Sequence, residues 1–212
     1  MKKFTSLAFW TYPRAGRRVA ALLASVSMMG VGVALFTMVG FGTDPCSTFS
    51  LGLSGKTGIS YGTCQLMLNA VLFIPVLLKD PSRIGLGTLA NMLLVGYCAD
   101  GFRWLTGPVV TPQSPMAIRL LCFFITLILF LLAASLYMAV DLGVAPYDAL
   151  PQMMAQKTKK LSFRTIRILW DLSFLVLGFL MGATVGLTTL LTGFCFGPAI
   201  VAVRQRTEPW FR

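Results

Sequence analysis

The stretch Leu35-Phe-Thr-Met-Val-Gly-Phe-Gly-Thr-Asp-Pro45 decides the fold of this chain, because a similar stretch follows it about 101 positions later. The second stretch reads Leu136-Tyr-Met-Ala-Val-Asp-Leu-Gly-Val-Ala-Pro146. Both end on a proline, and Gly42 in the first pairs with Gly143 in the second. The chain therefore contains an internal repeat.

The repeat continues beyond these two stretches. The block Gly85-Leu-Gly-Thr-Leu89 corresponds to Gly186-Leu-Thr-Thr-Leu190, and Asn69 falls opposite Asp171. Self-similarity of this kind marks an architecture built from two related units. In a membrane protein it also indicates where a site lies, at the interface between the units.

The composition indicates a membrane protein. Of the 212 residues, 56% are hydrophobic and only 12% are charged, with a mean hydropathy of +0.78. A soluble domain of this size needs more charge on its surface. We expect a single all-α membrane domain over residues 1–212, since an apolar stretch of about 20 residues spans a bilayer as a helix. The six predicted spans are 18–41, 61–79, 84–105, 117–140, 163–181 and 185–204.

The positions of the basic residues predict the topology. The net charge of +11 could indicate nucleic acid, but most lysines and arginines gather in four segments that lie on one face when the spans are counted, and only Lys56, Arg103 and Arg119 remain for the other face. They precede the first span, separate the second from the third and the fourth from the fifth, and follow the sixth. By the positive-inside rule both termini are expected to be cytoplasmic. Nucleic acid binding is not expected.

The two repeats are expected to be inverted. The first covers residues 19–105 and the second residues 117–204, with three spans in each. Two parallel sequence units with an odd number of crossings must enter the membrane from opposite sides. The sequence thus predicts two inverted three-helix repeats, the arrangement of many secondary transporters.

Metal and enzyme chemistry are not expected. The chain has no histidine, and its five cysteines are scattered singly without a CxxC pair. This pattern disfavours a metal site, a cofactor site or a disulfide framework. No nucleophile-base pair, phosphate-binding loop or pair of catalytic carboxylates emerges, so the protein is not expected to be an enzyme.

A short proline-initiated helix is expected after the first and the fourth span. Asp44 and Pro45 suit the N-cap and the first position of a helix. In the second repeat Pro146 takes the first position, Asp148 falls in the first turn, where the helix dipole favours a carboxylate, and Pro151 limits the helix to a turn or two. Two interpretations remain open: interfacial helices, or re-entrant segments whose N-termini line a central cavity.

Polar residues at membrane depth are the candidate binding site. Asp171 lies inside the fifth span, and Arg167 precedes it by four positions on the same helix face. Such a pair is a functional candidate, although it could also neutralise itself and tie two helices together. Asn69 and Asn91 add neutral polar groups in the second and third spans. The predicted substrate-binding or ion-binding residues are Asp171, Arg167, Asn69, Asn91, Asp44, Pro45, Pro146 and Asp148.

Four short motifs carry a resemblance to a known family. They are Gly42-xx-Pro45, Gly143-xx-Pro146-x-Asp148, Gly85-x-Gly87-Thr88 and Gly193-xxx-Gly197-Pro198. In these motifs, from about Arg18 to Arg204, the chain resembles the YczE/YyaS/YitT group of bacterial membrane proteins. The resemblance implies a multi-pass inner-membrane protein whose biochemical activity is largely undefined, and it supplies no catalytic residues.

These observations lead to three functional hypotheses. The first is a small permease-like transporter that moves a small solute or ion through a site between the repeats. The second is the substrate-binding subunit of an energy-coupling-factor transporter, and the third is a membrane accessory protein without transport activity. The lipid bilayer is the expected surrounding, and the small size of the chain leaves a homodimer open.

Overall fold

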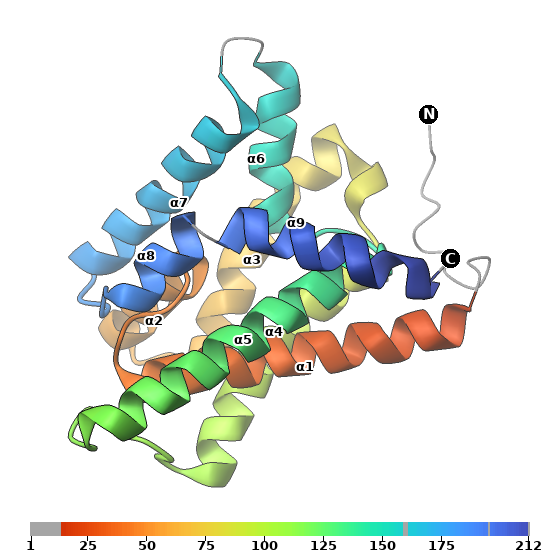
Figure 1. Ribbon diagram of the computed structural model, residues 1–212. Coiled ribbons are helices and arrows are strands. Elements are labelled where there is room, and N and C mark those ends of the chain that lie inside the picture. The colour runs from red at the N-terminus through yellow and green to blue at the C-terminus, as the bar shows by residue number, and fades with distance from the viewer. Residues whose placement is uncertain (1–13, 159–160, 195, 212) are drawn as a thin grey trace.

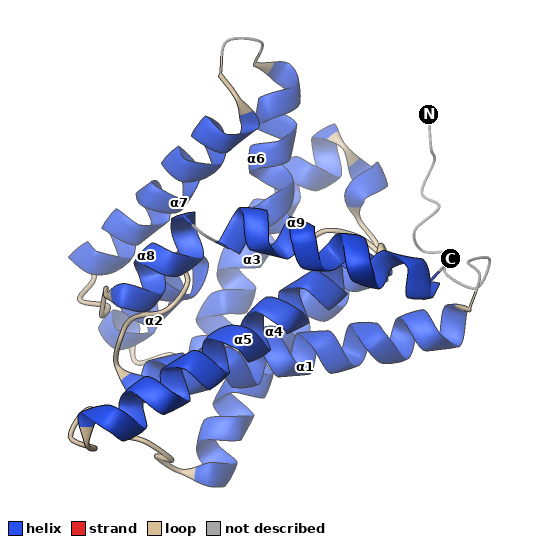
Figure 2. Ribbon diagram, viewed as in Figure 1, coloured by secondary structure: helices blue, strands red, loops and turns tan. Residues whose placement is uncertain are grey.

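The computed structural model describes residues 14–158, 161–194 and 196–211. Within these ranges the chain is all-helical, as predicted, and contains no strand (Figures 1 and 2). In chain order the elements are α1 (Ala15–Val39), α2 (Pro45–Thr57), α3 (Tyr61–Lys79), the 3-10 helix η2 (Pro81–Arg83), α4 (Leu86–Thr106), α5 (Met116–Val140), α6 (Pro146–Lys157), α7 (Phe163–Leu180), α8 (Leu187–Phe194), α9 (Phe196–Thr207) and the 3-10 helix η3 (Glu208–Phe211).

The two longest helices, α1 and α5, pack against each other and run in opposite directions (Figure 1). Arg18, in the first turn of α1, donates to the carbonyl of Val140 at the end of α5. Arg119, near the start of α5, donates to the carbonyl of Val39 at the end of α1. Because each arginine supplies donors for a carbonyl that a helix end leaves unpaired, it helps to terminate the opposite helix.

Two further helices flank this pair. α4 packs on α1, and α9 packs on α5. Both termini of the described chain lie near the same end of the molecule, where Arg14 Nη1 donates to the carbonyl of Trp210 in η3 at 3.0 Å (Figure 1). The buried faces of these helices are apolar; Val33 of α1, Phe130 of α5 and Phe196 of α9 belong to one core cluster.

The remaining helices pack crosswise. α2 lies against α7, and α3 lies against α6. The two proline-initiated helices, α2 and α6, therefore each contact both α3 and α7, the helices that follow them in the two halves of the chain. The α2–α7 contact is close: a Cβ added to Gly52 would lie 2.8 Å from the carbonyl oxygen of Gly178. Glycine on both sides lets the two backbones touch.

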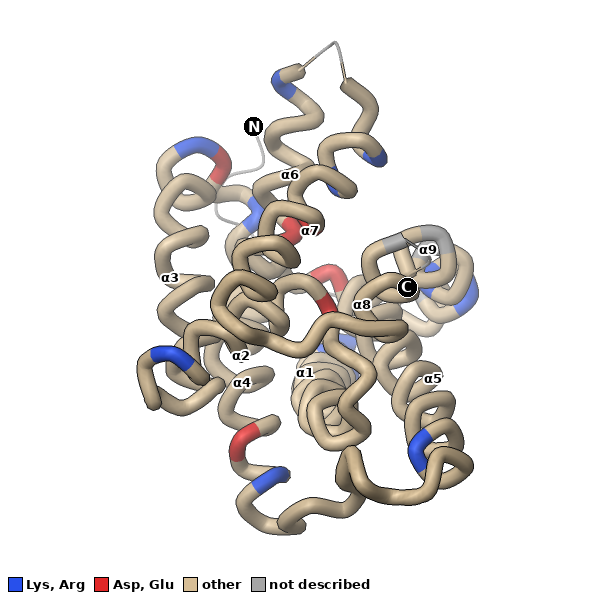
Figure 3. Tube along the Cα trace, turned by 90° about the vertical axis from the view of Figure 1, so that its left-hand side faces the viewer, with Lys and Arg blue, Asp and Glu red and all other residues tan. Residues whose placement is uncertain are grey.

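The outer surface suits a lipid bilayer. α1, α3 and α5 are long and apolar enough to cross a membrane. Large apolar side chains such as Leu78 of α3 and Phe124 of α5 are exposed on the outside. Many lysine and arginine positions lie near helix ends and connecting segments (Figure 3). An exposed apolar surface of this extent marks a contact with lipid or protein rather than with water.

The expected span over 185–204 is described in two parts, α8 (Leu187–Phe194) and α9 (Phe196–Thr207), and residue 195 between them lies outside the described residues. The break before this span is where the sequence predicts it: α7 ends at Leu180, and Gly182 has φ +90°.

The expectation that Pro151 limits the second proline-initiated helix to a turn or two is wrong. α6 continues through Pro151 to Lys157. Proline inside a helix removes one backbone hydrogen bond, and burial of Pro151 in the packed interface compensates for part of that loss. The helix starts agree with the prediction: Asp44 caps α2 by accepting from the Ser47 N–H, and Pro146 begins α6.

Candidate functional site

Four side chains of α6 and α7 form what we call the charged cluster: Tyr147, Asp148, Arg167 and Asp171. Arg167 donates from Nε to Asp171 Oδ2 at 2.9 Å and from Nη1 to Asp148 Oδ1 at 2.5 Å. The Tyr147 hydroxyl donates to the other oxygen of Asp171 at 2.7 Å. One guanidinium therefore serves two carboxylates, which leaves one negative charge uncompensated when all three groups are ionised.

The local sequence accounts for this geometry. Arg167 and Asp171 are one helical turn apart on α7, so their side chains meet on one face. Pro146 starts α6 and thereby places Asp148 in its first turn, where the helix dipole stabilises a carboxylate. The Arg167 guanidinium also lies 5.4 Å from the centre of the Tyr147 ring, within range of a cation–π contact.

The first half of the chain holds neutral side chains at the equivalent positions. Gln65, Asn69 and Cys46 stand where the charged cluster has Arg167, Asp171 and Tyr147, respectively. Gln65 Oε1 accepts from the Ser50 hydroxyl at 2.6 Å, and its Nε2 lies 3.6 Å from the sulfur of Cys46. We call Cys46, Ser50, Gln65 and Asn69 the neutral cluster. In the first half Gln65 of α3 thus contacts the first turns of α2, and in the second half Arg167 of α7 contacts the first turn of α6.

The two clusters meet through one apolar core. Cys46 of α2, Leu68 of α3, Tyr147 of α6 and Phe174 of α7 are buried together. The ring of Phe174 lies edge-on to the ring of Tyr147, with 5.0 Å between centroids. The first turns of α2 and α6 therefore approach the same core from the two halves of the chain.

Buried polar atoms without a partner surround this core. Among the described residues, Oδ2 of Asp44, Oδ1 of Asn69 and Nε1 of Trp170 are buried and form no hydrogen bond. Unpaired buried polar atoms are rare in folded proteins and need an explanation. Two of these three atoms are acceptors, so the surroundings suit a cation or a hydrogen-bond donor.

Two loops place the N-termini of α2 and α6. Residues 40–44, the first loop, precede α2, and residues 141–145, the second loop, precede α6. The Phe41 carbonyl accepts from the Thr188 N–H at 2.9 Å, and the Leu142 carbonyl accepts from the Gly87 N–H at 2.7 Å. Each loop is thus held by the helix that follows a Gly-rich turn in the other half of the chain.

Glycine is required at the matched position of both loops. Gly42 has φ +85° and Gly143 has φ +118°. A Cβ on Gly143 would lie 2.7 Å from both the backbone nitrogen of Gly85 and the hydroxyl of Thr88. A Cβ on Gly42 would meet Gly186 and Thr189 in the same way. The conformation and the close contact both exclude a side chain here.

The structure brings most of the predicted site residues together, and Asn91 is the exception. Asp148, Arg167 and Asp171 are in direct contact, and Pro45 and Pro146 begin the two helices whose first turns share the buried core. Asn91 is buried on α4, and no hydrogen bond of the described residues joins it to either cluster.

Sequence reasoning missed two members of the site. Gln65 and Tyr147 hold central places in the clusters, yet neither is ionised and neither was singled out as a site residue. The signal was present, because the register that pairs Asn69 with Asp171 also pairs Gln65 with Arg167. A position that is polar in both copies was the available clue.

A metal centre finds no support in the described residues. These ranges contain no group of three or more His, Cys, Asp or Glu side chains that could hold a metal ion. The four described cysteines, Cys46, Cys64, Cys98 and Cys122, are free thiols.

Comparisons with known proteins agree on one family. A family model described as a family of unknown function (DUF6198) matches residues 16–205. An uncharacterized protein of Haemophilus influenzae is 29% identical over 87% of this chain and 82% of its own length. The uncharacterized protein YyaS of Bacillus subtilis is 26% identical, over 84% of this chain and 87% of its own. The uncharacterized membrane protein YczE of Bacillus subtilis is 23% identical, over 89% and 81%. No solved structure matches the chain.

Proposed function

Since the chain belongs to the DUF6198 family and is similar to an uncharacterized membrane protein, we propose that this membrane protein is a small secondary transporter. In this proposal it carries a small solute through a site between two inverted halves. The charged cluster and the neutral cluster form the two walls of that site. The protein lies in the bacterial inner membrane with both termini in the cytoplasm, as the basic segments favour.

One observation carries the proposal: an ion-pair network, with Asp171 buried and with Asp148 and Arg167 partly exposed, lies where the other half of the molecule needs no charge. The neutral cluster fulfils the same structural task with hydrogen bonds alone. Burying charges costs free energy that an ion pair only partly recovers, so packing gives no reason to keep them. Ionisable groups inside a membrane protein commonly mark a substrate or ion pathway.

The inverted arrangement is supported by contacts that occur twice. Arg18 and Arg119 make the same contact with the opposite helix, and the two loops accept matching backbone hydrogen bonds. Contacts of this kind are expected from a two-fold axis that relates the halves. In this arrangement α1, α3, α4, α5 and α7 each cross the membrane, and α8 and α9 together form the sixth crossing.

The charged cluster suggests how the cargo couples to the protein. Arg167 forms an ion pair with both Asp148 and Asp171, so its guanidinium can pair more closely with either carboxylate. A proton or another monovalent cation that binds Asp171 replaces the charge of Arg167 there and leaves the guanidinium to Asp148. Asp148 belongs to α6, whereas Arg167 and Asp171 belong to α7. This exchange therefore changes the strength of the Arg167–Asp148 ion pair that joins α7 to α6.

The two loops differ in how firmly they are held. The second loop makes three hydrogen bonds to the segment 83–88: Leu142 O with Gly87 N, Val144 N with Arg83 O, and Val144 O with the Thr88 hydroxyl. Within the described residues, the first loop makes one such bond, from Thr188. In the proposed topology the first loop faces outwards, so this conformation is closed towards the cytoplasm and closer to opening outwards.

The proposal is tested by electrical recording from purified protein in liposomes on a solid support. A panel of amino acids, betaines, sugars and organic acids is applied with and without a pH gradient, and a solute that moves charge gives a transient current. We expect the wild type to respond to at least one solute class. If every class fails and the protein instead copurifies with ATPase subunits or with an enzyme, the binding-subunit or accessory hypothesis replaces this one.

A further inference from the structure

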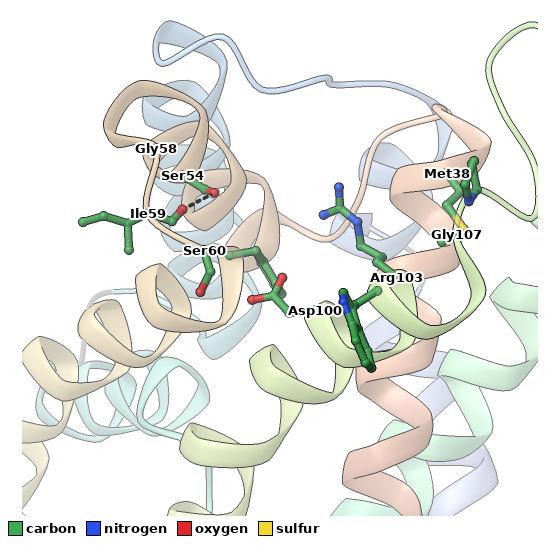
Figure 4. Close-up of a pocket in the computed structure, with 11 residues that line it drawn as sticks. Met38, Ser54, Gly58, Ile59, Ser60, Asp100, Arg103 and Gly107 are labelled. Carbon is green, nitrogen blue, oxygen red and sulfur yellow. Dashed lines mark hydrogen bonds between the residues drawn. The ribbon is translucent and has the colours of Figure 1, made fainter.

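An open pocket of about 570 Å³ lies away from the charged cluster, where the ends of α1, α2 and α4 meet the start of α3 (Figure 4). Its walls come from Met38, from Ser54 and residues 58–61, and from α4 with the loop that follows it. In the proposed topology this end of the molecule faces outwards. The volume suits a small metabolite, since ligand pockets commonly range from about 300 to 1,000 Å³.

Two opposite charges line this pocket without neutralising each other. Asp100 and Arg103 are three positions apart on α4, a spacing at which many pairs form an ion pair. Among the described residues no ion pair joins them, and their charged ends point in different directions (Figure 4). Asp100 Oδ2 instead accepts from the Gly62 N–H at 2.7 Å, which fixes the carboxylate at the pocket wall.

An aromatic ring and fixed polar groups complete the lining. Trp104 follows Arg103 in the sequence, lines the pocket and is 86% exposed. The face of an indole ring attracts cations, and proteins commonly use this contact to recognise quaternary ammonium groups. The Ser54 hydroxyl donates to the Ile59 carbonyl at 2.6 Å, which fixes the turn on the opposite wall (Figure 4).

Tyr61 connects this pocket with the neutral cluster. Tyr61 contributes to the pocket wall but is only 2% exposed. Its hydroxyl lies 3.0 Å from the Ser47 hydroxyl in the first turn of α2, and the Ser47 N–H donates to Asp44 at 3.1 Å. The pocket is thus separated from the first turn of α2, where Cys46 begins the neutral cluster, by a single side chain.

We propose that this pocket binds a small zwitterionic solute and is the outer loading site of the protein. The ammonium group of the solute lies against Asp100 and Trp104, and its acid group pairs with Arg103. One negative and one positive side chain balance each other in the lining, so a solute without net charge fits best. Binding itself is independent of the proposed function, but the assignment of the pocket to the transported substrate rests on it.

The test compares three probes of nearly the same shape in lipid-free detergent. Glycine betaine carries both charges, choline carries only the ammonium, and 3,3-dimethylbutanoate carries only the carboxylate. We expect betaine to raise the melting temperature and to bind in calorimetry, with choline and 3,3-dimethylbutanoate each binding about tenfold or more weaker, as the loss of one charged contact implies. Equal affinity for all three probes overturns the proposal. Binding by none of them also overturns it, unless phosphatidylethanolamine binds at this pocket.

Two isosteric or shortened variants locate the site. Asp100→Asn keeps an acceptor for the Gly62 N–H and removes the charge, and Arg103→Gln removes the guanidinium. Each is expected to weaken betaine binding about tenfold or more, whereas Lys56→Gln, at an exposed position outside the pocket lining, leaves it unchanged. Unaltered binding in both pocket variants contradicts the assignment.

A lipid headgroup with the same chemistry is distinguished in a second arm. Phosphatidylethanolamine also combines an ammonium with an acid group, and it is tested in nanodiscs against phosphatidylglycerol alone. A shift that phosphatidylethanolamine causes, that Arg103→Gln removes and that betaine does not reproduce supports the zwitterion site and identifies lipid as its source. If betaine binds but no solute produces a current, the binding site stands and the transport function fails.

Discussion

Arg18 and Arg119, one near the start of α1 and the other near the start of α5, each donate to a carbonyl at the far end of the other's helix. Arg18 Nη1 lies 2.6 Å from Val140 O, and Arg119 Nη2 lies 2.9 Å from Val39 O. Each guanidinium also lies near an aromatic ring, Phe211 for Arg18 and Phe41 for Arg119. The same contact made twice ties the two halves of the chain together along their central helices.

This relationship predicts that Arg119→Ala lowers the free energy of unfolding. The substitution leaves the Val39 carbonyl without its charged donor, and the expected loss is about 1–3 kcal/mol. Arg17→Ala is the matched control, because Arg17 is exposed on α1. Reversible unfolding in mixed detergent micelles measures both variants. Equal stability of the two would show that the Arg119 contact contributes nothing.

In the charged cluster, we expect a second substitution, Asp171→Asn, to restore stability that the first, Arg167→Gln, removes. Arg167→Gln alone leaves Asp171 buried without its cation and should cost about 3–5 kcal/mol. Adding Asp171→Asn converts both positions to the residues of the neutral cluster, Gln and Asn, and should recover most of that loss. Asp148 keeps its charge but is partly exposed, with 22% of its side chain accessible.

The double variant is compared with each single variant in the same unfolding assay. An additive loss, in which the double variant is less stable than Arg167→Gln, would mean that the two clusters are not structurally equivalent. A recovered stability together with lost activity would separate folding from function at this site.

The tight packing of the second loop implies that one added methyl group, in Gly143→Ala, lowers the stability of the protein strongly. Gly143→Ala places a Cβ 2.7 Å from the Gly85 backbone at φ +118°, so the loop must shift and the start of α6 with it. We expect a loss of more than about 1 kcal/mol. Gly55→Ala is the control, since its Cβ meets nothing within 4 Å in the last turn of α2, and we expect this variant to be at least as stable as the wild type. A lower melting temperature for Gly55→Ala than for Gly143→Ala would contradict this description of the loop.

The proposed inverted topology predicts opposite accessibility of two exposed positions. Lys56→Cys at the end of α2 and Lys157→Cys at the end of α6 are introduced singly into a chain without other cysteines. A membrane-impermeant maleimide added to intact cells should label position 56 and reach position 157 only after permeabilisation. Equal labelling from outside would rule out inversion.

The sequence predicts the helical class and the starts of the two short helices because these depend on local chemistry. Asp44 and Pro45 specify a cap and a first turn whatever surrounds them. The sequence prediction fails at Pro151, because α6 continues through a residue that disfavours helix. Long-range contacts are the least accessible from sequence.

The contacts of Arg18 and Arg119 illustrate that limit. Both residues read as ordinary charges at the ends of spans, and only the antiparallel packing of α1 on α5 brings each to the other's last turn. The pairing of Asp171 with Arg167 was readable from their spacing, whereas the contribution of Tyr147 required the position of α6 relative to α7.

The most direct test of the proposed function compares transport currents of Asp171→Asn and Asp141→Asn in liposomes of equal protein content. Asp141 is an exposed carboxylate at the end of α5 with φ 54°, a conformation that asparagine also adopts. For any solute that drives a current in the wild type, we expect Asp171→Asn to abolish the current and Asp141→Asn to retain it. A folded Asp171→Asn protein that transports at the wild-type rate would contradict the proposed role of Asp171 in transport.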